Sequence, residues 1–161
     1  MKYLKYRTIH IILLLFIFQA AMGQEPPPRP LRITVTQNLS FGAFYQGAGG
    51  GTVRVRTDLS RNATGDVVLL TMGYSFSPAI YSITGTPGRI VSFLNPGEIT
   101  LTGSNGGSLK LNLGSSNPAS PFVLSSTPLS LYIEGILTVG PPASNPPGNF
   151  SGSFNITLMQ E

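Results

Sequence analysis

Apolar and polar residues alternate along six short segments of this chain, and this period of two constrains the fold more than any other feature. In each segment every second side chain is Leu, Ile, Val or Phe, and the segments span residues 31–37, 52–57, 98–102, 108–113, 129–134 and 153–158. Because successive side chains of a β-strand point to opposite faces, each segment predicts a strand with one buried and one solvated face. Further strands are expected over 79–84, 89–93, 122–124 and 136–139. The apolar run at 67–70 predicts a strand buried on both faces.

Short clusters rich in Gly, Pro and Asn separate these segments. They lie at residues 47–51, 86–88, 95–97, 105–107 and 145–148, and their composition is typical of turns. No stretch after residue 23 shows sustained helical periodicity. Short strands joined by turns, without helices, favour an all-β fold, an antiparallel sandwich or barrel.

The first 23 residues have the layout of a secretory signal peptide. Three positive charges in residues 1–10 precede eight uninterrupted apolar residues at 11–18, and small residues follow. Cleavage is expected after Gly23, which makes Gln24 the new N-terminus, followed by a proline-rich leader at 24–30 and one domain at 31–161. The apolar stretch is too short for a stable membrane span, which needs about 20 residues. The sequence therefore predicts export to the periplasm, the cell surface or the extracellular space.

The composition excludes most catalytic chemistry. The chain has no Cys, and its one His, His10, lies in the signal. A Ser-His-Asp or Cys-His site, structural zinc, attached haem and iron–sulfur clusters therefore all lack their residues. Three of the ten basic residues also lie in the signal, which leaves seven bases against six acids without a clustered basic footprint. We expect no enzyme activity, no cofactor and no nucleic-acid partner.

Three features could still carry a ligand, and for each we expect a structural role. The glycine-rich residues 47–52 lack the Lys and the following helix of a phosphate-binding loop, so they predict a flexible turn. The loop from Asp58 to Asp66 has oxygen ligands suited to calcium but not the ordered spacing of a calcium loop. It predicts a polar loop without metal, and calcium remains the alternative. Five aromatic residues could stack on a sugar or a partner, although core or sheet-face packing is expected for them: Tyr45, Tyr74, Phe76, Tyr81 and Tyr132.

A series of motifs resembles a known family. They are ITVTQNLSFGAFYQGAGGGTVRV (33–55), ATGDVVLL (63–70), YSITGTPG (81–88), GEITLTGSNGG (97–107) and the tail at 135–158. In this order they resemble exported bacterial proteins catalogued as domain of unknown function 4402, from Leu31 to Met159. In the tail, Phe150 stands where the family has an aromatic residue, often Tyr. The resemblance implies a pilin-like or immunoglobulin-like β-sandwich of secreted or surface proteins, and it implies no catalytic residues.

Two functions are consistent with these observations. The first is a structural subunit that assembles with copies of itself, or with related surface subunits, by strand addition. Leu31, Ile33 and Val35 form the candidate pairing segment, and the alternative is that this segment is the first strand of its own domain. Phe154, Ile156 and Leu158 form the closing strand and should face the core. The second function is a monomeric, adhesin-like module that binds a glycan or a surface protein through its loops.

The signal peptide gives the first testable prediction. Mass spectrometry of the exported protein should show a chain that begins at Gln24, because Ala21 and Gly23 supply the small residues that signal peptidase requires. Exported protein that retains Met1 would contradict the prediction.

Overall fold

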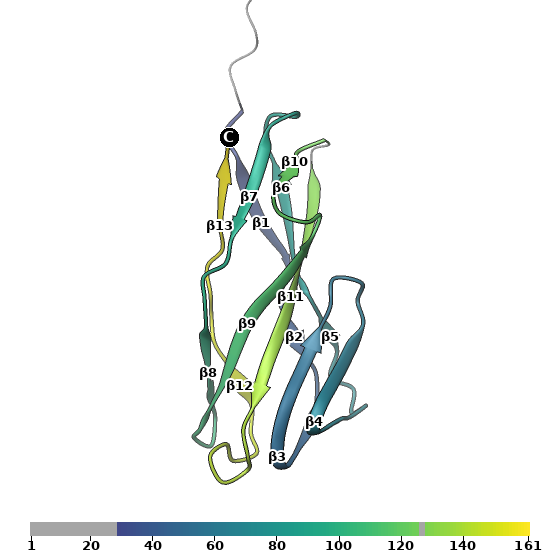
Figure 1. Ribbon diagram of the computed structural model, residues 1–161, viewed down its shortest axis with the longest axis vertical. Helices are drawn as coiled ribbons and strands as arrows, with labels where there is room; N and C mark the ends of the chain where they lie inside the picture. Colours follow the sequence, from purple (N-terminus) through teal and green to yellow (C-terminus); the bar gives the residue numbers. More distant parts are fainter. Residues whose placement is uncertain (1–28, 126–127) are drawn as a thin grey trace, which may run out of the picture.

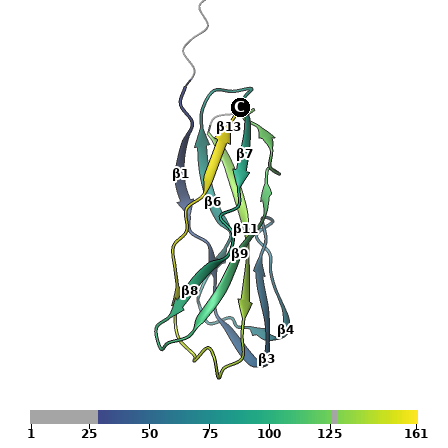
Figure 2. The ribbon, with the colours of Figure 1, turned by 60° about the vertical axis from the view of Figure 1, so that its left-hand side comes forward.

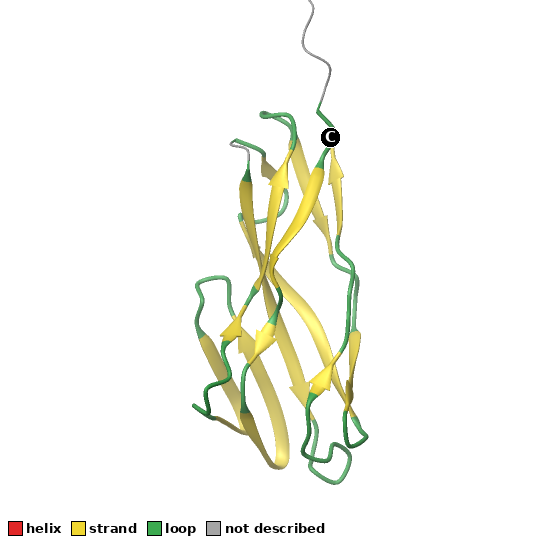
Figure 3. Cartoon of the chain, turned by 180° about the vertical axis from the view of Figure 1, so that it is seen from behind, coloured by secondary structure: helices red, strands yellow, loops and turns green. Residues whose placement is uncertain are grey.

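The computed structural model describes residues 29–125 and 128–161, and this part of the chain consists of strands and loops without a helix. The molecule is elongated, and its strands run roughly along the long axis (Figure 1; Figure 3 from behind). The strands are β1 (Arg32–Gln37), β2 (Ser40–Phe41), β3 (Phe44–Val55), β4 (Arg61–Leu69), β5 (Phe76–Ser77), β6 (Ala79–Thr84), β7 (Ile90–Leu94), β8 (Ile99–Gly103), β9 (Ser108–Asn117), β10 (Phe122–Val123), β11 (Leu129–Val139), β12 (Phe150–Ser151) and β13 (Thr157–Gln160). Every pair of these strands is antiparallel, which confirms the predicted all-β, antiparallel class.

Strand β11 organises the largest sheet. Along one edge it pairs first with β6, from Leu129 to Ile133, and then with β3, from Gly135 to Val139. Its other edge pairs with β9, with a register shift between Ile133 and Gly135. The sequence predicts separate strands at 129–134 and 136–139, but the ladder with β9 runs through this irregularity and joins them into one.

The strands form three sheets around one apolar core. The main sheet has the order β1-β6-β11-β9-β8-β12, with β3 and β4 branching from β11; a second has the order β10-β7-β13, and β2 pairs with β5. The core contains the inward residues of the alternating segments, chiefly Val53, Val55, Tyr81, Ile83, Val91, Leu101, Leu109, Leu111, Leu113, Leu124, Leu131, Ile133, Leu137 and Val139. The alternation in the sequence therefore identifies most of the buried face.

The glycine-rich turn predicted at 47–51 is wrong, since these residues lie inside β3. The register between β3 and β4 shifts between Gln46 and Gly51, so the glycines form a bulge. Gly50 has a φ of +65°, and a Cβ there would collide with the Val139 carbonyl oxygen of β11. At Gly51 a Cβ would collide with the Thr64 carbonyl oxygen of β4. Glycine is therefore required because β3 passes closely between two backbones.

The prediction that residues 67–70 are buried on both faces is also wrong. Val67 is buried, but Val68 is 56% exposed and lies opposite the exposed Tyr45 of β3. Strand β4 pairs with β3 alone, so it is an edge strand. Its outward side chains accordingly lie in solvent.

The closing segment at 153–158 is interrupted rather than one strand. Strand β12 pairs with β8 in the main sheet, whereas β13 pairs with β7 in the second sheet, and residues 152–156 between them belong to no strand. Phe154, Ile156 and Leu158 are half-buried and pack against the core. The segment keeps its alternation while it crosses from one sheet to the other.

The burial along β11 gives a prediction about stability. Leu131 is fully buried and its neighbour Ser130 is exposed. Leu131→Ala should lower the free energy of unfolding by about 2–5 kcal/mol because it leaves a cavity in the core. Ser130→Ala should change it by about 0.5 kcal/mol or less. Chemical denaturation measures both values, and equal losses would contradict the register of β11.

Candidate functional site

Strand β1 places the predicted pairing segment at the edge of the main sheet. It pairs with β6 from Arg32 opposite Thr84 to Gln37 opposite Ile80, and it ends the strand order of the sheet. Just before it, the Arg29 N–H donates a hydrogen bond to the Thr86 hydroxyl at 2.8 Å. In this molecule the segment is therefore the first strand of its own sheet, the alternative that the sequence leaves open.

The side chains of β1 remain unusually accessible. All six residues are exposed, and Ile33 and Val35, on the face that also carries Ile83, are 39% and 56% exposed. Only Leu31, just before the strand, is half-buried and packed against the core. Strand β1 is thus held mainly by its ladder to β6 and little by side-chain burial.

A cleft of about 790 Å³ lies in the other half of the molecule. One wall is formed by residues 39–46 and the other by residues 148–154. The floor is apolar and consists of Leu101, Leu109, Leu111 and Leu137. No Asp, Glu, Lys, Arg or His is among the described residues that line it. The cleft is therefore suited to an uncharged occupant.

Three large side chains at the cleft are exposed to solvent. Tyr45, Met72 and Tyr74 line it and are 61%, 65% and 66% exposed. Of the five aromatic residues considered in the sequence, Tyr45 and Tyr74 thus reach a surface that a partner could contact. Tyr81 is instead buried in the core, and burial raises the pKa of its phenol. Met72 was not predicted from the sequence, although its apolar side chain within the polar segment TMGYS was a signal that could have identified it.

Arg61 of β4 holds the first wall of the cleft. Its Nη1 donates hydrogen bonds to the carbonyl oxygens of Phe41 at 2.7 Å and Ala43 at 3.3 Å, and its Nη2 donates to the Leu70 carbonyl oxygen at 3.2 Å. The guanidinium also lies over the Phe76 ring, 4.6 Å from the centroid. One side chain at the start of β4 therefore binds three backbone carbonyls, one in β2 and two in loops.

Amide side chains hold the second wall. The Asn105 Nδ2 donates to the Pro147 carbonyl oxygen at 2.6 Å, and Ser104 exchanges hydrogen bonds with Asn149. The Gln46 side-chain amide of the first wall donates to the Asn145 carbonyl oxygen. This contact joins the first wall to the chain just before the second wall.

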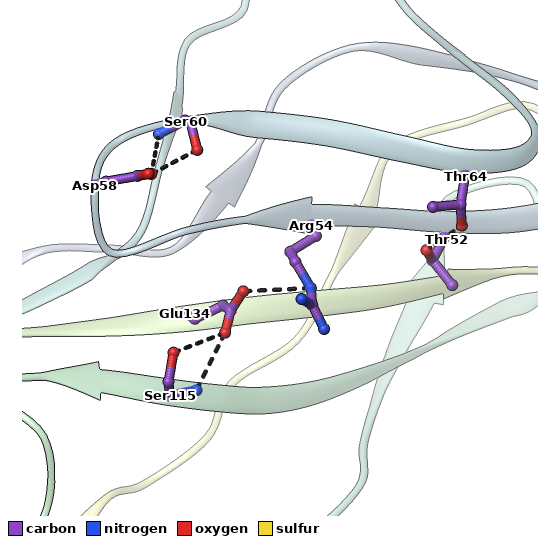
Figure 4. Close-up of polar contacts among 7 residues, drawn as sticks. All are labelled: Thr52, Arg54, Asp58, Ser60, Thr64, Ser115 and Glu134. Carbon is purple, nitrogen blue, oxygen red and sulfur yellow. Dashed lines mark hydrogen bonds and ion pairs between the residues drawn. The ribbon is translucent and has the colours of Figure 1, made fainter.

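The polar groups outside the cleft have structural partners (Figure 4). Glu134 is buried, forms an ion pair with Arg54 at 3.3 Å, and accepts hydrogen bonds from the Ser115 backbone and hydroxyl at 3.2 and 2.9 Å. Thr52 of β3 lies opposite Thr64 of β4, and the two hydroxyl oxygens are 2.6 Å apart. These contacts join neighbouring strands and give both carboxylate oxygens of Glu134 a structural partner.

The structure does not bring Asp58 and Asp66 together as ligands. Asp58 accepts hydrogen bonds from the Ser60 hydroxyl and from the Ser60 N–H at 2.9 Å, which hold the pKa of its carboxyl below the usual value. Asp66 lies within β4 and accepts a hydrogen bond from the Gly49 N–H at 3.1 Å. Over residues 29–125 and 128–161, no three His, Cys, Asp or Glu side chains cluster as metal ligands would.

The expected signal peptide, its cleavage site at Gly23 and Gln24, and most of the leader lie outside the described residues. In the described part of the chain, no helix has the length and hydropathy needed to span a membrane.

Comparisons with known proteins give one match. A family model described as Domain of unknown function (DUF4402) matches residues 31–159. No curated protein and no solved structure matches the chain.

The contacts of Arg61 predict that lysine cannot replace it. Arg61→Lys should lower the free energy of unfolding by about 1–3 kcal/mol, because an ammonium group cannot reach three carbonyl oxygens in the planar geometry of a guanidinium. Arg89→Ala, which removes an exposed arginine, is the control and should cost about 0.5 kcal/mol or less. Thermal or chemical denaturation compares the stability of the two variants, and equal stability would show that the Arg61 hydrogen bonds do not stabilise the fold.

Proposed function

Because the chain belongs to the family described as Domain of unknown function (DUF4402), which carries no assigned activity, we propose its function from its surfaces. We propose that it is an exported surface protein, a pilin-like or immunoglobulin-like β-sandwich that assembles with copies of itself. Assembly occurs when β1 of one copy pairs with a neighbouring copy by strand addition. The protein is a structural subunit and not an enzyme.

The observation that carries this proposal is the exposure of β1. A strand at a sheet edge presents unpaired N–H and C=O groups that can pair with another chain. Natural edge strands are commonly short or rich in charges and proline, whereas β1 has six residues, one charge and no proline. Its apolar Ile33 and Val35 remain partly in solvent. Departure of β1 from β6 would uncover Leu31 and the buried part of Ile33, so pairing with a neighbour must bury at least as much apolar surface there.

The remaining chemistry agrees with a structural role. The described residues contain neither His nor Cys, and the one buried carboxylate, Glu134, is held by Arg54 and Ser115. The export signal predicted from the sequence would deliver the subunit to a compartment where surface structures are built.

A second candidate function is favoured by the loop that carries Met72 and Tyr74. Their exposure is also what a monomeric, adhesin-like module would need to bind a surface protein. A glycan is the other ligand of such a module, and it would meet hydrogen-bonding groups here, because Ser40, Gln46 and Asn149 also line the cleft.

A disulfide lock on β1 tests the proposed assembly. Thr34 lies directly opposite Ser82 of β6, and the chain has no other Cys to interfere. In the Thr34→Cys/Ser82→Cys variant, oxidation should tie β1 to its own β6. Light scattering should then show concentration-dependent assembly of the reduced protein and a monomer after oxidation.

The matched control is the Thr52→Cys/Thr64→Cys variant, which ties β3 to β4 and leaves β1 free. It should assemble in both redox states. If the oxidised β1 lock assembled as well as the reduced protein, or if the reduced and wild-type proteins stayed monomeric at every concentration, the proposed assembly would be wrong.

A further inference from the structure

We infer that the cleft between residues 39–46 and 148–154 is the acceptor site for β1 of a second copy. The inference rests on the proposed function and adds to it the place where the strand binds. It commits to one occupant, the segment from Leu31 to Gln37 of a neighbouring molecule.

The chemistry of the cleft selects an apolar, uncharged face. Its floor consists of leucines, its walls include Phe44, Phe150 and Phe154, and no charged side chain among the described residues lines it. A ligand that brought a charge into this cleft would lose the hydration of that charge and gain no partner. Only the uncharged, apolar side of a ligand can therefore face the floor.

The second wall favours a peptide strand over another apolar ligand. Residues 152–156, which include Gly152 and Phe154 of this wall, belong to no strand. Sheet pairing is thus interrupted between β12 and β13 where the wall borders the cleft. An extended peptide supplies the backbone donors and acceptors that such a segment lacks, whereas a lipid chain supplies none.

The segment from Leu31 to Gln37 has the pattern that this cleft requires. Leu31, Ile33 and Val35 share one face, and the only charge, Arg32, lies on the other face with Thr34 and Thr36. While β1 pairs with β6, the face that carries Leu31, Ile33 and Val35 remains partly in solvent, because Ile33 and Val35 are exposed. In the cleft the same face would cover the exposed Tyr45, Met72 and Tyr74, so apolar burial favours binding there.

The occupant must come from another molecule. Strand β1 starts at the end of the molecule where the C-terminus lies and runs toward the half that holds β3 and β4 (Figure 2), and only Asn38 and Leu39 separate it from β2. Leu39 packs closely against Gly135, since a Cβ added to Gly135 would lie 2.7 Å from the Cδ2 of Leu39. A copy could not fold β1 back into its own cleft without unpacking Leu39. Donation to the next copy gives a head-to-tail chain of subunits.

A synthetic peptide of residues 29–37 tests the site directly. It should be titrated into the oxidised Thr34→Cys/Ser82→Cys protein, whose β6 edge is occupied by its own β1, so that only a site elsewhere can accept the peptide. The locked protein should bind the peptide, and Tyr74→Asp in the locked background should weaken binding about tenfold or more, because it places a charge at the apolar cleft.

Two matched controls accompany the titration. Val123→Asp introduces the same charge at an exposed apolar residue of β10, away from the cleft, and should leave the affinity within about twofold. A peptide with Ile33→Asp and Val35→Asp should not bind. Circular dichroism of each protein variant checks that it is folded.

The outcomes separate this inference from the proposed function. If the peptide binds the unlocked protein but not the locked one, β1 exchanges on β6; the cleft is then not the acceptor, while assembly by strand addition stands. If the locked protein does not bind the peptide, or binds it equally with Tyr74→Asp and Val123→Asp, the inference is overturned. Whether the proposed function fails is decided separately, by the light scattering of the unlocked protein.

Discussion

The structure depends on the point where one edge of β11 changes its partner from β6 to β3. The change occurs at Glu134 and Gly135, where the ladder to β9 also shifts register. A Cβ at Gly135 would lie 2.7 to 2.9 Å from the side chains of Leu39 and Phe41, so any larger residue would have to push these two side chains aside. The buried Glu134 is held by Arg54 of β3 and Ser115 of β9, which ties both neighbouring strands to the same point.

This change of partner divides the molecule into two halves, one with an exposed edge strand and one with a cleft. In one half β6 and β1 extend the sheet, and β1 forms its accessible edge. In the other half β3 and β4 take over that edge, and the cleft lies between the start of β3 and the chain after β12. One half thus ends in an apolar strand that is poorly buried, and the other contains an apolar cleft without charges. The proposed assembly follows from the complementarity of these two features.

Much of the fold could be predicted from the alternation of side chains, and the failures have physical causes. Leu109, Leu111, Leu131 and Ile133 are buried as expected, because a half-buried strand shows its faces in the sequence. The bulge in β3 could not be predicted, because a glycine cluster that forms a turn looks the same in the sequence as one that lets a neighbouring backbone approach closely. The exposure of Val68 and the cleft depend on which strands end at a sheet edge, and that information lies in long-range pairing. Of the candidate site, the sequence predicted β1 but not its acceptor.

The central claim is that β1 is held by one ladder and opens independently of the core. Native-state hydrogen exchange measures this directly, because an amide that exchanges through local opening reports a lower free energy than one that requires global unfolding. The β1 amides that pair with β6 should exchange with an opening free energy at least about 2 kcal/mol below that of the β11 amides between Leu131 and Leu137. Equal protection of β1 and β11 would show that β1 is an integral part of the core structure, and the account would then be wrong.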